Sequence, residues 1–143
     1  MKLKHIRVIV LVLFVTVTIG MVVSCQSDEQ VEFNRYYSAG SLVYQTHCQN
    51  CHGVHGEGLQ GLIPPLTDSA YLKTNKDILA CSVKFGLKGR ITILNRHFEG
   101  TMPPNDLAPI NLAMALTYVT NSFGNKLGTI PSEQVEKDLN TCK

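Results

Sequence analysis

Two cysteines and a histidine at fixed spacing constrain this 143-residue chain more than any other feature. They are Cys48, Cys51 and His52, within the stretch THCQNCHGVHGEG that covers residues 46–58. Thiols and imidazoles at this density can hold a zinc ion, form a redox-active dithiol or attach a haem covalently. Each alternative requires a different protein around the motif, so the rest of the sequence must distinguish between them.

The order C-x-x-C-H favours covalent attachment of a haem. Residues i and i+3 of a helical turn lie on one side of it, so Cys48 and Cys51 can both form thioether bonds while the imidazole of His52 binds the iron. A zinc site with His55 as a further ligand leaves the N-terminal export signal and the GTMPP sequence around Met102 unexplained. A thioredoxin-like dithiol belongs beside a βαβ pattern, which this sequence lacks.

The second axial ligand of such an iron must come from a distant part of the chain. The candidates are Met102, Met114, His47, His55 and His97. Met102 lies in GTMPPN, where a glycine and two prolines favour a non-helical loop that can hold its sulfur at a defined point. Met114 lies in an apolar helical stretch, where methionine usually fills core space. His47 lies on the wrong side of its own attachment motif, and His55, among glycines, is expected at the surface. Met102 is therefore favoured, with His97 or an open position as the alternatives.

The N-terminal 24 residues have the pattern of an export signal. Three basic residues among the first seven precede an apolar run that ends near Val23, and this run is shorter than the roughly 20 residues that span a bilayer. The sequence VVSC at 22–25 resembles the lipobox of bacterial lipoproteins. We therefore predict a signal peptide at 1–24 and a lipid on Cys25, which would anchor the protein in the bacterial cell envelope, on the periplasmic or outer face. An uncleaved membrane anchor is the alternative.

Removal of the predicted signal changes the charge of the protein. The whole chain carries +2, but three of its thirteen basic residues lie in the signal, which leaves ten basic and eleven acidic residues. Positive charge is then concentrated in a basic band, which comprises Lys73, Lys76, Lys84, Lys88, Arg90 and Arg96. We expect this band to dock an acidic protein partner, and an ordinary solvated surface is the alternative. No binding to nucleic acid is predicted.

Composition and periodicity divide the mature chain into a tether and one domain. The polar, acidic residues 25–35 are expected to form a flexible tether. The domain is predicted at 36–143, with a core at 36–124 and a tail at 125–143.

Hydrophobic spacing predicts a mostly helical domain. One helix is expected from Tyr36 into the cysteine motif, a second ends at Gly86, and a third begins at Pro109 and runs to a C-terminal glycine at Gly124. The segment GRITILNRHFEG is expected to form a small hairpin with its turn at Asn95-Arg96. A short helix is predicted after residue 131.

From about Tyr36 to Gly124 the chain resembles the class I monohaem cytochromes c of the small bacterial type. The resemblance depends on the C-x-x-C-H motif, on GTMP around Met102, on PPL at 64–66 and on the two terminal helices. It implies an all-α fold in which the N- and C-terminal helices cross, with one or two middle helices around one covalent haem. The possible hairpin would precede the methionine loop.

The resemblance also implies roles for particular residues. Pro64 would offer its backbone carbonyl to Nδ1 of His52, and Leu66 would pack against the haem. Three further residues would meet where the terminal helices cross: Gly40, Tyr44 and Tyr118.

Histidine–methionine ligation implies an electron carrier and not an enzyme, because both axial positions of the iron are filled. Methionine ligation also raises the reduction potential. The expected partners are redox proteins, such as a membrane respiratory complex or a terminal reductase, and the carrier is expected to be a monomer. A haem-bearing accessory subunit of a larger membrane oxidoreductase is one alternative. A haem enzyme or gas sensor with an open or labile sixth position is another.

The C-terminal tail departs from the simplest members of this family. It contains Cys142, and Cys81 is the other cysteine without a role. Export implies an oxidising compartment, so a disulfide between the two is predicted, with two free thiols as the alternative. Closing a loop of about sixty residues would stabilise the protein by roughly 4 kcal/mol on the chain-entropy account.

Overall fold

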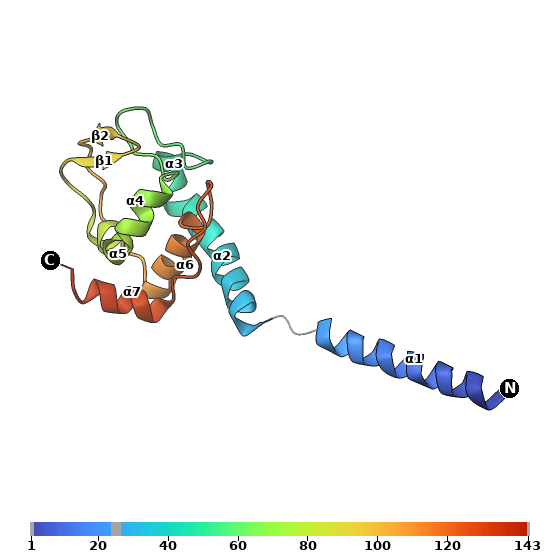
Figure 1. Cartoon of the computed structure of the whole chain (residues 1–143). Coiled ribbons are helices and arrows are strands. Elements are labelled where there is room, and N and C mark those ends of the chain that lie inside the picture. The colour runs from blue at the N-terminus through green and yellow to red at the C-terminus, as the bar shows by residue number, and fades with distance from the viewer. Residues whose placement is uncertain (1, 24–26, 143) are drawn as a thin grey trace. The chain divides into compact units, whose positions relative to one another are not determined.

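The structure is a computed structural model that describes residues 2–23 and 27–142. The chain divides into two compact units, Met1–Val31 and Glu32–Lys143. The elements in chain order (Figure 1) are α1 (Lys2–Val23), α2 (Asp28–His47), α3 (Gln49–His52), α4 (Ser69–Thr74), α5 (Lys76–Phe85), β1 (Ile91–Ile93), β2 (Arg96–Phe98), α6 (Pro109–Val119) and α7 (Ser132–Leu139). The described residues thus form helices and one two-stranded sheet, which confirms the predicted all-α class with a small hairpin.

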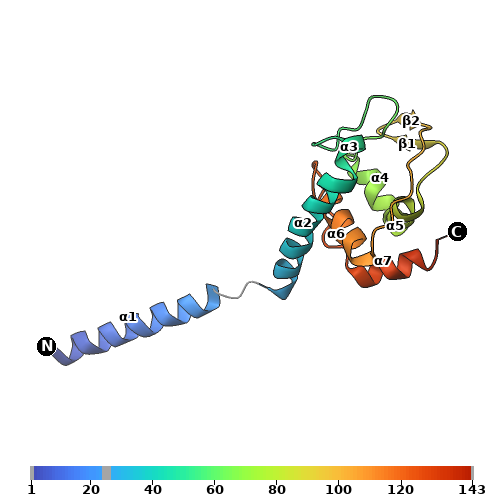
Figure 2. The ribbon, with the colours of Figure 1, turned by 180° about the vertical axis from the view of Figure 1, so that it is seen from behind.

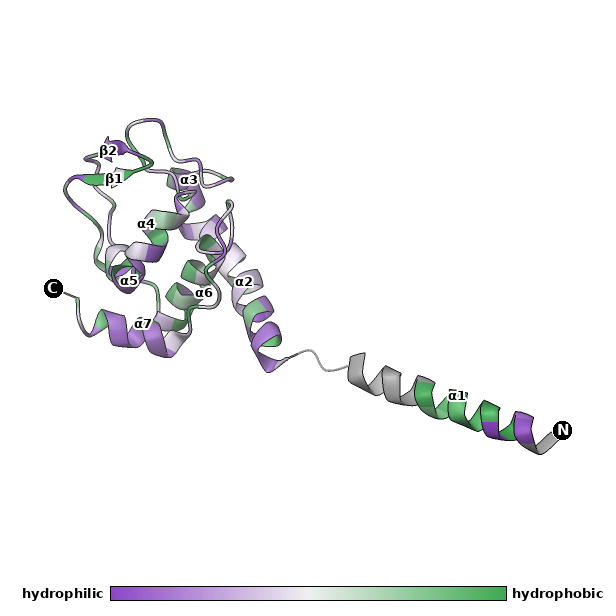
Figure 3. Cartoon of the chain, viewed as in Figure 1, coloured by the Kyte–Doolittle hydropathy of each residue, from purple (hydrophilic) through white to green (hydrophobic). Residues whose placement is uncertain are grey.

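α1 lies within the predicted export signal at 1–24. Its apolar side chains from Ile6 to Val15 are exposed, and Figure 3 shows this part of the helix as hydrophobic. No helix in the described ranges is both long and apolar enough to cross a membrane. The predicted lipidation site, Cys25, lies outside the described residues.

α2 begins earlier than predicted, so the flexible tether at 25–35 is wrong for residues 28–35. The carbonyl of Ser27 accepts a hydrogen bond from the N–H of Gln30 at 2.9 Å, and two acidic residues in the first turn suit the positive end of the helix dipole. A serine followed three residues later by glutamine has the spacing of a capping box. That signal indicates a helix start that composition alone does not reveal.

α2 and α6 make a close contact at Gly40. A Cβ atom at this position would clash with the carbonyl oxygen of Met114, so glycine is what allows the helices to approach. Tyr44 is 1% exposed, and its ring centroid lies 5.3 Å from that of Tyr118 on α6. The predicted meeting of these residues is confirmed. Figures 1 and 2 show α2 and α6 side by side from opposite directions.

The hairpin forms where the sequence predicts it, with its turn one residue earlier. β1 and β2 pair antiparallel around Leu94 and Asn95, not around Asn95-Arg96. Leu94 and Asn95 have φ values of 49° and 59°, as a two-residue hairpin turn with two left-handed residues requires. The N–H of Leu94 also donates to the carboxylate of Asp68 at 2.9 Å, a tertiary contact that favours this turn position.

α6 starts at Pro109, as predicted, but ends at Val119 and not near Gly124. The backbone N–H of Asn121 turns to the carbonyl of Tyr118 at 3.2 Å, while its side-chain amide donates to the carbonyl of Thr117 at 2.8 Å. In a continued helix the Thr117 carbonyl would accept from that backbone N–H, so this side-chain bond favours termination here.

The segment predicted as a tail at 125–143 contributes to the core through its described residues, 125–142. Ile130 and Val135 are 2% and 0% exposed and join the same hydrophobic cluster as the helices before them. Cys142, just after α7, forms a disulfide with Cys81 of α5, which is the pairing that the sequence predicts. The tail therefore holds α5 against the body of the domain.

The α2–α6 contact yields a stability prediction. Gly40→Ala should lower the free energy of unfolding by about 1–3 kcal/mol, because the added methyl group overpacks a contact with backbone atoms that cannot rotate away. The measurement is chemical denaturation of the whole protein, with Ser38→Ala on the exposed part of the same helix as the control. Equal stability of the two variants would contradict the close contact.

Candidate functional site

The cysteine motif forms a short helical turn directly after α2. The N–H of Cys48 donates to Tyr44 in α2 at 2.9 Å, and its carbonyl accepts from Cys51 and His52 at 3.1 and 3.0 Å. Cys48 is half-buried, Cys51 is exposed, and the two thiols are not bonded to each other. Burial, followed by the nearby Cys51, raises the pKa of Cys48 to about 11.

His52 is buried, and its ring is held in one orientation. Nδ1 lies 3.1 Å from the carbonyl oxygen of Pro64, and because a carbonyl only accepts, Nδ1 is the protonated nitrogen. Burial lowers the pKa of this imidazole, and the bond to Pro64 opposes that shift. The neutral ring therefore leaves Nε2 as the nitrogen that can bind a metal.

The loop after His52 is fixed by backbone contacts on both sides. The carbonyl of His52 accepts from the N–H of Gly58 at 2.8 Å, and the hydroxyl of Tyr44 donates to the carbonyl of Gly53 at 2.6 Å. The N–H of Leu66 donates to Gly56 at 2.7 Å. These bonds hold the Pro64–Leu66 segment opposite the histidine.

Two cavities adjoin this turn. The first has about 770 Å³ and the second about 530 Å³ of unfilled space, counted together with the space where each opens to solvent. Cys48 lines the first and Cys51 the second, whereas His52 and Met102 line both. The site thus brings together the four side chains that the sequence singles out.

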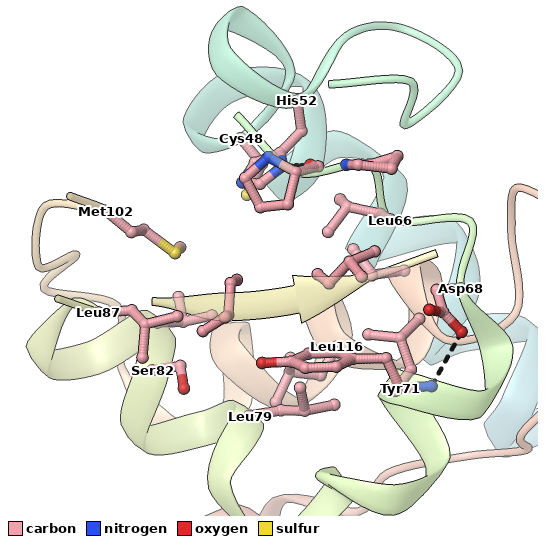
Figure 4. A pocket seen from close by; sticks show the side chains of 17 residues that line it. Cys48, His52, Leu66, Asp68, Tyr71, Leu79, Ser82, Leu87, Met102 and Leu116 are labelled. Atoms are coloured by element: carbon pink, nitrogen blue, oxygen red, sulfur yellow. Dashed lines mark hydrogen bonds between the residues drawn. The ribbon is translucent and has the colours of Figure 1, made fainter. Parts of the chain in front are cut away.

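Apolar side chains form most of the lining of the first cavity. These side chains include Leu66, Leu72, Leu79, Val83, Ile91, Ile93, Leu116 and Val119. Figure 4 shows Met102 extending into the cavity from its loop, with His52 and Cys48 on the turn above it and Tyr71 and Leu79 below. Such a lining excludes water from any group bound between His52 and Met102.

The loop that contains Met102 is paired with the end of α5. The N–H of Met102 donates to the carbonyl of Leu87 at 2.9 Å, and the N–H of Leu87 donates back at 3.0 Å. Gly86 allows this approach, since a Cβ there would lie 2.5 Å from the carbonyl oxygen of Met102, and its φ is 80°. Gly86 and Leu87 are thus site residues that the sequence analysis missed. The only local signal is a glycine after a helix.

The competing ligand candidates do not line the cavities. His97 is exposed, lies on β2 opposite Thr92 and is 3.1 Å from its hydroxyl through Nδ1. The alternation of β1 turns Ile91 and Ile93 toward the cavity and the Thr92–His97 pair outward. Neither His97 nor the remaining candidates, His47, His55 and Met114, line either cavity.

Asn125 is a second residue that the sequence analysis missed. It is 2% exposed, and its amide nitrogen donates to the carbonyls of Leu66 and Val119 at 2.8 and 3.0 Å. Its side-chain oxygen accepts from Ser69 at 2.6 Å. Asn125 therefore joins the cavity wall at Leu66 to the end of α6. A polar residue in a predicted tail carries no sequence signal of such burial.

The predicted basic band is partly neutralised. Lys84 forms an ion pair with Asp106 at 2.6 Å, and Arg90 pairs with Glu99. The Lys84 ammonium holds the pKa of the Asp106 carboxyl below its usual value. In the part of the chain that the structure describes, the band members Lys73, Lys76, Lys88 and Arg96 form no ion pair.

The residues of the site fit a covalently bound haem. Two thiols border the cavities, a neutral imidazole and a thioether face them, and the walls are apolar. A zinc site finds less support, because the described residues contain no group of three or more histidines, cysteines or carboxylates that could hold a metal ion.

Gly86 yields a prediction about the methionine loop. Gly86→Ala should accelerate amide hydrogen exchange at Leu87 and Met102, because the new methyl group must displace the Met102 carbonyl. Relative to wild type, Gly86→Ala should lower the free energy of unfolding by about 1–3 kcal/mol more than Gly89→Ala does. Gly89 is the matched control: its φ of 101° imposes a similar backbone cost, but nothing lies within 4 Å of the added atom. Equal effects of the two substitutions would argue against the close approach.

Comparison with known proteins matches residues 37–122 to the family model described as Cytochrome c. No curated protein matches the chain.

Proposed function

Because this chain belongs to the cytochrome c family, whose members bind haem covalently and transfer electrons, we propose that it carries one haem c with His52 and Met102 as the axial ligands. The thioether bonds would come from Cys48 and Cys51. The observation that carries this proposal is that His52 and Met102 line both of the cavities that adjoin the two cysteines. Among the candidate ligands, His97 finds less support, because it lies on the outward face of the hairpin.

The surrounding residues would keep the site in one state during electron transfer. Pro64 orients the imidazole of His52 through Nδ1, and the Leu87 pair holds Met102 in place. When bound, the haem supplies one-electron chemistry as its iron alternates between ferric and ferrous states. Fixed ligands and a dry lining limit the rearrangement that accompanies each transfer. Both axial positions filled by protein favour a carrier over an enzyme.

The exchange of electrons is proposed to occur at the second cavity. Cys51 and Leu62 both line this cavity. Cys51 is exposed, and Leu62 is 68% exposed. Lys88 is also exposed and follows Leu87, which lines both cavities. We propose that Lys88 contributes to docking an acidic redox partner, whereas the paired Lys84 and Arg90 contribute less.

The N-terminal sequence supports a proposal about the cellular location of the carrier. We propose that Cys25 carries a lipid and tethers the domain to a bacterial membrane on the periplasmic or outer face. A membrane respiratory complex or a terminal reductase would then be within reach as a partner. The support for this part is the VVSC sequence and the exposed apolar helix before it.

Replacement of Met102 tests the proposed ligation. The purified haem-loaded protein should be low-spin, with the weak far-red band of sulfur–iron ligation in the oxidised state, and Met102→Ala should lose that band and lower the reduction potential. Met114→Leu is the control, because it replaces a methionine that lines neither cavity by a residue of similar volume. A wild-type protein without the band would refute Met102 as the ligand. Absence of haem after expression with the maturation machinery would refute the site itself.

Neutralisation of Lys88 tests the docking proposal. Lys88→Gln should slow oxidation of the reduced protein by the hexacyanoferrate(III) anion roughly two- to tenfold at low ionic strength, and the difference should disappear at high salt. Lys137→Gln, an exposed residue on α7, is the control. Stopped-flow absorption gives both rates. Identical salt dependence of the two variants would rule out a role for Lys88 in attracting an anionic partner.

A further inference from the structure

We propose that Lys84 is a positioning residue for Met102, an inference that rests on the proposed function of Met102 as an iron ligand. Lys84 lies in the last turn of α5. Its ammonium donates to the backbone carbonyl of Leu107 at 3.0 Å and to the carboxylate of Asp106 at 2.6 Å. It thereby joins α5 to the far end of the loop that begins at Met102.

The methionine loop depends on α5 for its backbone contacts. Two consecutive prolines follow Met102 and have no N–H to donate. The N–H of Asn105 donates to the carbonyl of Val83 at 3.0 Å, and Met102 exchanges both of its bonds with Leu87. Lys84 lies between these two attachments in sequence and supplies a third. The loop is therefore fastened at residues 83, 84 and 87 of one short segment.

The carbonyl bond is the stronger of the two contacts that Lys84 makes. The side chain of Asp106 is 99% exposed, so the ion pair lies in water and contributes little. The side chain of Lys84 is 25% exposed and Leu107 is 5% exposed, so their bond is shielded. A charge-assisted bond to a shielded carbonyl also leaves that carbonyl without a partner when the lysine is removed.

The opposite side of α5 is held by a separate attachment. The disulfide from Cys81 to Cys142 joins α5 to α7, and Leu79 and Ala80 are buried in the core. α5 is thus a firm support, and loss of the Lys84 bond should loosen the loop rather than the helix. A looser loop would let the sulfur of Met102 leave the iron more often.

The test measures how readily Met102 gives up its position in the haem-loaded, full-length ferric protein. Imidazole can bind the iron only after the sulfur departs, so its binding rate at saturating imidazole reports loop opening. Lys84→Met retains the apolar stem but not the donor, and it should accelerate binding about tenfold, the fold-change expected for loss of one charge-assisted hydrogen bond. Lys84→Arg, which retains charge and donors, should restore the rate to within about threefold of wild type.

Two controls distinguish the effect of losing the carbonyl bond from the effect of losing a charge. Asp106→Asn removes the ion pair alone, and Lys73→Met removes an exposed, unpaired charge on α4; each should change the rate by less than about twofold. Amide exchange provides a second measurement: Lys84→Met should raise the rate at Met102 and Asn105 and leave Leu127, whose N–H bonds to Thr120, unchanged.

Some results would overturn the inference. A Lys84→Met rate equal to that of Lys73→Met would do so, as would an equally large effect of Asp106→Asn. Acceleration of exchange at Leu127 together with Met102 would indicate general destabilisation and would also overturn it. Failure of the Met102 ligation itself would be recognised separately, because the wild-type protein would then lack the far-red sulfur band.

Discussion

The hydrogen bond between Nδ1 of His52 and the carbonyl of Pro64 is the contact on which the rest of the site depends. It links a helical turn to a loop twelve residues later and fixes both the tautomer and the plane of the imidazole. The loop can offer that carbonyl only because Leu66 bonds to Gly56 and Asn125 bonds to Leu66. Asn125 in turn is anchored at the end of α6. A single oriented ring therefore requires α2, the loop and α6 together.

The two proposed axial ligands are supported in different ways. His52 belongs to a turn that continues directly from α2, and α2 is locked to α6 at Gly40. Met102 belongs to a proline-containing loop that has no helix of its own and is fastened to the end of α5. Stability on the histidine side thus comes from helix packing, while stability on the methionine side comes from a few hydrogen bonds. The position of Met102 should therefore be more sensitive to single substitutions than that of His52, since only a few contacts hold its loop.

Local signals in the sequence predicted several features correctly, and the failures share one cause. Pro109 and Gly86 mark helix ends through their own backbone preferences, and the structure confirms both. The hairpin turn at Leu94 was predicted one residue too late, and the end of α6 at Val119 was predicted several residues too late. Both depend on side chains whose partners sequence periodicity does not identify, namely Asp68 for the turn and Asn121 for the helix end. The burial of Asn125 has the same origin.

The sequence by itself predicted the attachment chemistry, because Cys48, Cys51 and His52 are neighbours on one helical turn and their geometry follows from the helix alone. It also narrowed the second ligand to a short list. Only the tertiary structure distinguishes Met102, which lines both cavities, from His97, which is five residues away and lines neither. In a hairpin, successive side chains alternate between faces, so a shift of one residue in register would exchange the inward and outward sets. The observed register turns His97 outward, and the backbone pair with Leu87 directs Met102 into the cavity.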